Sequence, residues 1–201
     1  QTCALPISGA TDCSYKYDVL GRRIEATIGS TTEHYFYDGN DVIVDYDDSA
    51  TPALKKRYLT PGLDENMIVW DASDNPYYYF HDGLGSVRNI LDSSGQEKNS
   101  YDYKAFGEAL GDSDEEVDNR YQYTGREKDA ADHYYYRARY YRPSQGRFGS
   151  VDPIGMVDGP NLYIYVKNRA TNARDFYGLC FGCSKYPSLS THQKAQSIAR
   201  K

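Results

Sequence analysis

The sequence lacks several features that would place it in a common functional class. No apolar run reaches the roughly 18 residues that a membrane-spanning helix needs. No charged stretch followed by an apolar one stands at the start, so no signal peptide is visible. No long basic stripe occurs and the formal net charge is -6, which argues against a nucleic-acid partner. No Ser-His-Asp arrangement or glycine-rich phosphate loop is present either, which removes the usual hydrolase and nucleotide-binding patterns.

Cysteine is scarce and scattered. The four cysteines are Cys3, Cys13, Cys180 and Cys183. Residues 1–7 look like the translation of a sequencing-adapter oligonucleotide, so we interpret them as an assembly artefact and the chain as a fragment of a longer protein. The remaining three cysteines form no disulfide framework. Cys180 and Cys183 with His192 offer three of the four ligands of a structural zinc site, so we expect no metal and no other cofactor.

An acidic segment spans residues 112–118 and begins Asp-x-Asp, as calcium-binding loops do. It lacks the mid-loop glycine and the terminal glutamate of an EF-hand. We therefore interpret it as a solvated loop.

Tyrosine is the residue in excess. The 201 residues include 22 Tyr, against 6 Phe and 1 Trp. Tyrosine favours strands and combines a large apolar ring with a polar tip. A chain of this length suffices for one domain that buries roughly 70% of its unfolded surface. The composition therefore predicts an all-β fold.

Short repeated units support that prediction. Tyr17-Asp18-x-x-Gly21-Arg22 combines a strand end, an aspartate that bonds its own following backbone, and a glycine free to take positive φ. Residues 35–40 and 101–108 repeat the theme. The pattern predicts stacked β-hairpins from about residue 15 to 141 and irregular or short helical structure over 143–179. We also expect an open sheet edge near the start.

The stretch around which the chain is organised is 125–179. Its tyrosine run, 134–141, taken as one strand, alternates between two faces. One face holds Tyr134, Tyr136, Ala138 and Tyr140, and the other holds Tyr135, Arg137, Arg139 and Tyr141. Spacing alone indicates an ordinary amphipathic strand.

The order of motifs in this stretch indicates more. The motifs are Gly-Arg-Glu at 125–127, Gly-Arg-Phe at 146–148, Asp-Pro-Ile-Gly at 152–155, Asn-Leu-Tyr-Ile-Tyr at 161–165 and Asp-Phe-Tyr-Gly-Leu at 175–179. Together they resemble the RHS repeat-associated core domain of RHS/YD-repeat proteins, over roughly 15–179. This family is related to insecticidal toxin complex C subunits and to teneurins. The chain departs from the family pattern in two places, since the closing motif lacks its proline and Asn168 is followed by Arg169.

The resemblance divides the chain into four parts. After the adapter residues 1–7, residues 8–110 correspond to YD/RHS repeat hairpins and 111–179 to the associated core. Residues 180–201 correspond to the start of a variable effector or to a vestigial tail. These 22 residues are too few to fold alone without staples.

The resemblance also implies a function. Family members form a hollow β-shell that encloses a C-terminal toxin, and the core cuts the chain after the closing Gly-Leu. The implied catalytic pair is Asp152 and Asp175, the implied scissile bond is Leu179–Cys180, and Arg147 could orient or charge-balance a carboxylate. Two carboxyls held close do not both ionise, so one can act as acid while the other activates water. Such an enzyme turns over once, in cis. The alternative is that both aspartates only shape turns.

A non-enzymatic reading stays open as well. The same repeats could build a cell-surface scaffold or adhesin, and an aromatic groove could bind carbohydrate. In either case we expect the upstream RHS repeats and the C-terminal effector as partners, together with a target-cell surface. The expected location is secreted or at the cell surface, with an export signal outside this chain.

Overall fold

The computed structural model describes residues 13–111, 114–129 and 132–179. Within them the chain forms fourteen strands in two sheets, and its helices are four 3-10 turns of three residues each. The all-β prediction, with short helical pieces after residue 143, is confirmed. No helix among the described residues is long and apolar enough to cross a membrane.

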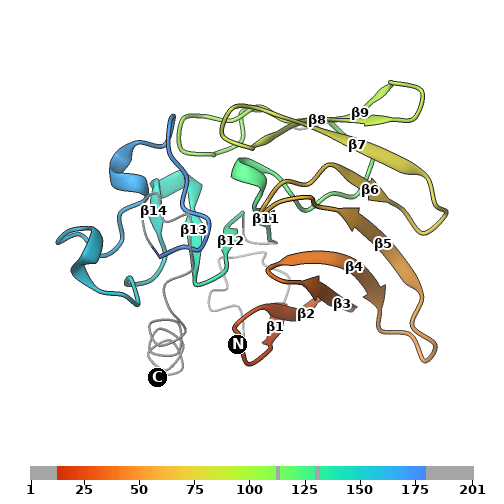
Figure 1. The fold of residues 1–201 in the computed structure, drawn as a ribbon, viewed down its shortest axis with the longest axis horizontal. Helices are drawn as coiled ribbons and strands as arrows, with labels where there is room; N and C mark the ends of the chain where they lie inside the picture. Colours follow the sequence, from red (N-terminus) through yellow and green to blue (C-terminus); the bar gives the residue numbers. More distant parts are fainter. Residues whose placement is uncertain (1–12, 112–113, 130–131, 180–201) are drawn as a thin grey trace. The chain divides into compact units, whose positions relative to one another are not determined.

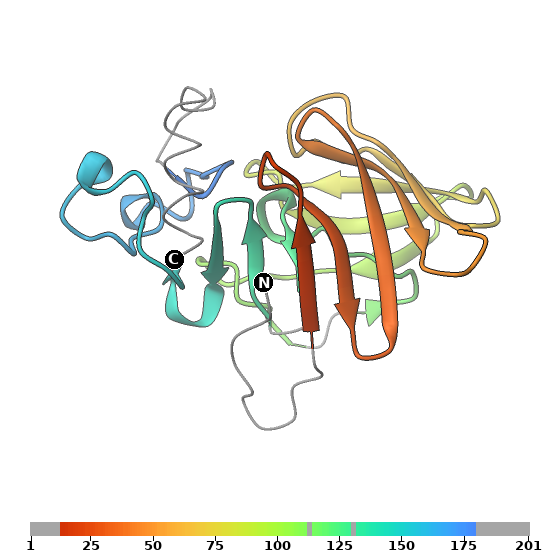
Figure 2. The ribbon, with the colours of Figure 1, turned by 90° about the horizontal axis from the view of Figure 1, so that it is seen from below.

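The larger sheet is a meander in which each strand lies beside its neighbours in sequence (Figures 1 and 2). Its strands are β1 (Cys13–Tyr17), β2 (Arg23–Ile28), β3 (Thr31–Asp38), β4 (Asp41–Asp47), β5 (Leu54–Leu59), β6 (Ile68–Trp70), β7 (Pro76–His81), β8 (Val87–Asp92), β9 (Glu97–Ser100) and β10 (Asp114–Glu115). Among the residues that the structure describes, β1 pairs with β2 and ends the strand order, as expected for an open edge.

Aspartate and glycine together turn several of these hairpins. Between β1 and β2, Asp18 Oδ1 accepts the backbone N–H groups of Leu20 and Arg22 at 2.8 and 2.9 Å. Gly21 takes a φ of 81° and donates its N–H to the Asp18 carbonyl at 3.0 Å. Because only glycine adopts this φ at little cost, the spacing Asp-x-x-Gly defines the corner. The same corner recurs at Asp82 and Asp92.

One face of this sheet buries tyrosine against arginine. The Arg23 guanidinium lies 4.8 Å from the ring centre of Tyr15 and 5.9 Å from that of Tyr35, and all three residues are buried. Tyr58 donates its hydroxyl to the buried Asp45 carboxylate at 2.7 Å. Cation–π contacts and charge-assisted hydrogen bonds thus add to the burial of aliphatic side chains such as Val42, Val69 and Ile90.

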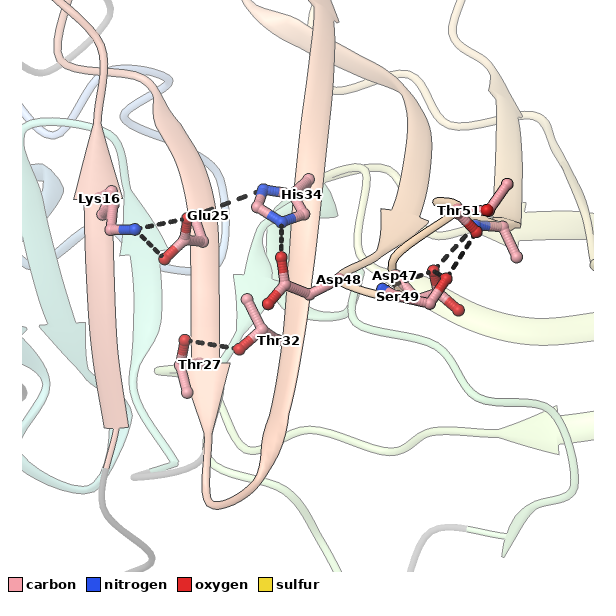
Figure 3. Close-up of polar contacts among 10 residues, drawn as sticks. Lys16, Glu25, Thr27, Thr32, His34, Asp47, Asp48, Ser49 and Thr51 are labelled. Carbon is pink, nitrogen blue, oxygen red and sulfur yellow. Dashed lines mark hydrogen bonds and ion pairs between the residues drawn. The ribbon is translucent and has the colours of Figure 1, made fainter.

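The opposite face carries a chain of polar contacts across neighbouring strands (Figure 3). Lys16 pairs with Glu25 at 2.8 Å, and His34 lies between Glu25 at 3.7 Å and Asp48 at 2.8 Å. Exposed pairs of this kind contribute little to stability, but cross-strand partners help to fix the register.

The smaller sheet follows in the order β11 (Glu127–Lys128), β12 (Tyr134–Tyr136), β13 (Arg139–Arg142) and β14 (Arg147–Phe148). The 3-10 helices are η1 (Tyr123–Gly125), η2 (Pro143–Gln145), η3 (Met156–Asp158) and η4 (Val166–Asn168).

The interpretation of 134–141 as a single strand is wrong. The run is a tight hairpin, in which Tyr134 pairs with Tyr141 and Tyr136 with Arg139. The chain reverses at Arg137, whose φ is 55°. The reversal places Tyr141 on the same face as Tyr134. In a single strand, the two residues would lie on opposite faces.

This hairpin builds an aromatic core. The buried cluster contains Tyr123, Tyr134, Tyr136, Tyr141, Phe148, Tyr165, Val166 and Ala170. Tyr165 is its centre, with ring centroids 4.3 Å from Tyr141 and 5.6 Å from Tyr136. Edge-on and tilted contacts of this kind add to the stabilisation from burial.

The chain divides into two compact units. Among the described residues, the first unit comprises 13–80, 88–100 and 114–117. It holds the larger sheet apart from His81 at the end of β7 and Val87 at the start of β8. The other comprises 81–87, 101–111 and the described residues from 118 onward. All the side chains of the candidate site belong to the second unit.

Several predictions concern residues outside the part of the chain that the structure describes. The adapter residues 1–7, the start of the acidic segment at 112–113, and Cys180, Cys183 and His192 lie outside the described residues. Within the described ranges, no group of three or more His, Cys, Asp or Glu side chains could hold a metal ion.

Candidate active site

The two predicted aspartates meet at one arginine. Arg139 Nη2 lies 2.9 Å from Asp152 Oδ2 and 3.6 Å from Asp175 Oδ2. The exposed fractions of these residues are 3% for Arg139, 7% for Asp152 and 3% for Asp175. The chain thus brings together two carboxylates that are 23 residues apart in sequence.

Each aspartate leads an Asp-x-x-Gly corner. Asp152 Oδ1 accepts Ile154 N–H at 3.0 Å, and Gly155 takes a φ of 73°. Asp175 Oδ1 accepts the N–H groups of Tyr177 and Leu179, both at 3.2 Å.

The geometry is that of the hairpin corners in the larger sheet. It uses Oδ1 for the turn and leaves Oδ2 for Arg139. The same side chains therefore both shape a turn and pair with Arg139.

Arg139 is held on all sides by the second unit. Its Nε donates to the Gly178 carbonyl at 2.5 Å and its Nη1 to the Leu162 carbonyl at 3.2 Å. The guanidinium carbon lies 3.6 Å from the ring centre of Phe148, which is itself buried. A buried guanidinium needs such partners because its desolvation is costly. The result is one fixed positive charge facing two carboxylates.

Leu179 sits directly beside this group. Its side chain is buried, and its backbone N–H is bonded to Asp175. Cys180, the other half of the predicted scissile bond, lies outside the described residues.

Arg147, the arginine predicted to serve the carboxylates, is placed elsewhere. It is exposed on β14, donates to Gln145 Oε1 at 3.0 Å and lies 5.9 Å from the Tyr163 ring centre. Among the described residues the position beside both aspartates belongs to Arg139. Sequence reasoning missed it because the single-strand interpretation gave Arg139 no reason to face the closing motif. The signal available was its place in the Arg-x-Arg of the tyrosine run.

Comparison with known proteins identifies the family. No profile of a known protein family matches the chain. The chain is 38% identical over 162 residues to the tRNA3(Ser)-specific nuclease WapA of Bacillus spizizenii, covering 77% of the chain and 7% of that protein. It is 37% identical over 195 residues to toxin subunit YenC2 of Yersinia entomophaga, covering 83% of the chain and 19% of that protein. The fold matches a TccC3 mutant of the Photorhabdus luminescens Tc holotoxin pore, with a TM-score of 0.69, 25% identity, and coverage of 94% of this chain and 10% of that one.

The chain belongs to the RHS/YD-repeat family, as an RHS repeat-associated core. It is related to toxins of the polymorphic type and spans under a fifth of the length of these curated relatives.

The RHS core supports its site with neutral tyrosines. Burial raises the pKa of Tyr123 to about 12, and burial also raises the pKa values of Tyr136, Tyr141 and Tyr165 well above the ordinary value. Tyr136 shares hydrogen bonds with Thr124 Oγ1 at 2.6 Å and with Tyr165 at 3.1 Å. Tyr136 ends β12 and pairs with Arg139 of β13, so this network fixes the strand on which Arg139 is paired.

Proposed function

We propose that this RHS core cuts its own chain once, after Leu179, by an aspartyl-type reaction of Asp152 and Asp175. The observation that carries the proposal is the meeting of both carboxylates at Arg139, with Asp175 also bonded to the Leu179 N–H. Arg139, instead of Arg147, fixes and charge-balances the pair.

The proposed reaction is hydrolysis of one tethered peptide bond. One aspartate takes a proton from water as the water oxygen attacks the Leu179 carbonyl carbon. The other aspartate, protonated, gives its proton to the nitrogen of Cys180 as the C–N bond breaks. Because the bond is held beside the carboxyls, the effective molarity is high and a slow site suffices for a single turnover.

The cut would release the segment that begins at Cys180 as an effector. The RHS core would act with upstream RHS repeats of the same protein, which would enclose the effector until delivery to a target cell. The whole protein would then be secreted or at the cell surface. Similarity to toxin subunit YenC2 and to the TccC3-containing pore supports this part of the proposal.

A second candidate is a non-enzymatic surface module that binds carbohydrate. The observation that favours it is an apolar groove of about 410 Å³ on the larger sheet, lined by His34, Phe36, Val44, Tyr46 and Pro52. Phe36 is exposed and meets Tyr46 edge-on, with ring centroids 5.5 Å apart. Exposed aromatic rings can stack on the apolar faces of sugars.

The deciding experiment is to express the chain with its tail and to weigh the products by mass spectrometry. Wild type is expected to give a new C-terminus at Leu179, and Asp152→Asn is expected to stay intact. Asparagine keeps the shape and the turn acceptor but cannot exchange the proton. If both chains stay intact, or both are cut after Leu179, the aspartyl reaction is excluded for this chain. In the intact case the surface module becomes the leading function.

A further inference from the structure

Three consecutive residues of the β12–β13 turn hold three consecutive carbonyls of the closing motif. Arg137 Nη1 donates to the Phe176 carbonyl at 2.5 Å. Ala138 N–H donates to the Tyr177 carbonyl at 3.2 Å, and Arg139 Nε donates to that of Gly178 at 2.5 Å. The closing motif is thus bound in register along the turn, one donor to one carbonyl, up to the residue before Leu179.

Arg137 also contacts a side chain of the closing motif, the ring of Tyr177. Its guanidinium carbon lies 5.6 Å from the ring centre of Tyr177, which is buried. The φ of 55° at Arg137 is unfavourable for any residue but glycine. That conformation aims Arg137, Ala138 and Arg139 at the same segment, so the strained turn and the three contacts depend on one another.

We propose that Arg137 is a positioning residue for self-cleavage, and that the turn 137–139 is a clamp for the chain on the N-terminal side of the scissile bond. This inference rests on the proposed function. Arg137 would hold the peptide in place while Asp152 and Asp175 perform the chemistry. Because Arg137 contacts a backbone carbonyl and not an aspartate, we expect it to affect the position of the Leu179–Cys180 bond and not proton transfer.

The clamp also defines which substrate the site accepts. Main-chain carbonyls are common to all residues, so the contact with the Phe176 carbonyl does not select for a particular residue type at position 176. Gly178 is different, because its φ is 66° and a Cβ there would lie 2.4 Å from the Tyr136 carbonyl oxygen. The site therefore selects a tethered segment with glycine directly before the residue whose carbonyl is attacked.

The test compares cleavage rates in the full chain by mass spectrometry over time. We expect Arg137→Ala to slow cleavage about 10- to 100-fold, the loss for one charge-assisted hydrogen bond. Arg137→Lys should recover part of the rate, because an ammonium group can still reach the Phe176 carbonyl. Arg169→Ala, at an exposed arginine of the same unit, should cut at the wild-type rate. Equal rates for wild type and Arg137→Ala overturn the proposal, as does an Arg137→Lys rate no faster than that of Arg137→Ala.

Two further measurements separate the clamp from folding and from the proposed function. Arg137→Gly tolerates the positive φ, so it removes the side chain without adding strain and should fold if Arg137→Ala does not. Amide hydrogen exchange, measured in the uncut Asp152→Asn chain, should speed up at Tyr177 and Leu179 when Arg137→Ala is added, and stay unchanged at Tyr134. If wild type is never cut, the proposed function fails, and unchanged exchange at Tyr177 and Leu179 then overturns the clamp independently.

Discussion

Gly178 and the carbonyl oxygen of Tyr136 approach so closely that a methyl group on the glycine would lie 2.4 Å from that oxygen. The oxygen belongs to the backbone of a paired strand and cannot swing aside. We therefore expect Gly178→Ala to stop self-cleavage and to lower the free energy of unfolding by about 1–3 kcal/mol, the usual cost of a strained backbone position. Chemical denaturation and mass spectrometry measure the two effects. Gly83→Ala is the control, since nothing lies within 4 Å of a Cβ at that position. A Gly178→Ala chain that cuts normally would contradict the close approach.

Removal of the Arg139 charge should lower the free energy of unfolding more than removal of a surface arginine charge. Arg139→Gln would leave Asp152 and Asp175 buried without their shared cation, and breaking such a group destabilises by about 3–5 kcal/mol. We expect loss of cleavage and a lower denaturation midpoint, with Arg169→Gln close to wild type. The prediction fails if Arg139→Gln is as stable as Arg169→Gln.

Alkaline pH should weaken the aromatic core before the rest of the chain. The ordinary pKa of tyrosine is 10.0, and burial raises that of Tyr123 to about 12. Between these values the unfolded state loses a proton that the folded state keeps, so stability falls as pH rises. Denaturation midpoints should therefore drop from pH 10 upward. Tyr123→Phe should show a shallower slope. Phenolate absorbance at pH 10 equal to that of the denatured chain would refute the prediction.

Hairpin corners in the repeat region can be tested at Asp82. Its Oδ1 accepts two backbone N–H groups, from Leu84 and Ser86. Asp82→Ala leaves both without this acceptor, and we expect a loss of about 1–3 kcal/mol in the free energy of unfolding. Asp82→Asn retains a side-chain oxygen and should lose less. Equal losses in the two variants would show that the corner does not depend on this acceptor.

The sequence predicted the parts of the fold that local chemistry decides. The motif Tyr17-Asp18-x-x-Gly21-Arg22 predicts a hairpin corner made by one aspartate and one glycine. The structure has that corner at Asp18 and Gly21. Asp152 and Asp175 came from motif resemblance, and the structure brings them together.

What could not be predicted depends on one backbone torsion. The run 134–141 has the alternation of a strand, and nothing in its residue types announces a positive φ at Arg137. Tertiary contacts, including those of Arg137 with Phe176 and Tyr177, favour the reversal there. Since Arg139 faces the aspartates only after that reversal, the choice between Arg139 and Arg147 was beyond local reasoning.

The shared corner at Asp18, Asp82, Asp152 and Asp175 has a consequence for how such a site can arise. At Asp18, Asp152 and Asp175 one carboxylate oxygen serves the corner and the other meets an arginine. A protein made of these corners carries a supply of ready-oriented acids before any selection for chemistry. Two of them directed at one guanidinium make a pair, so the proposed self-cleaving site would need only a rearrangement of ordinary corners, with no new kind of side chain.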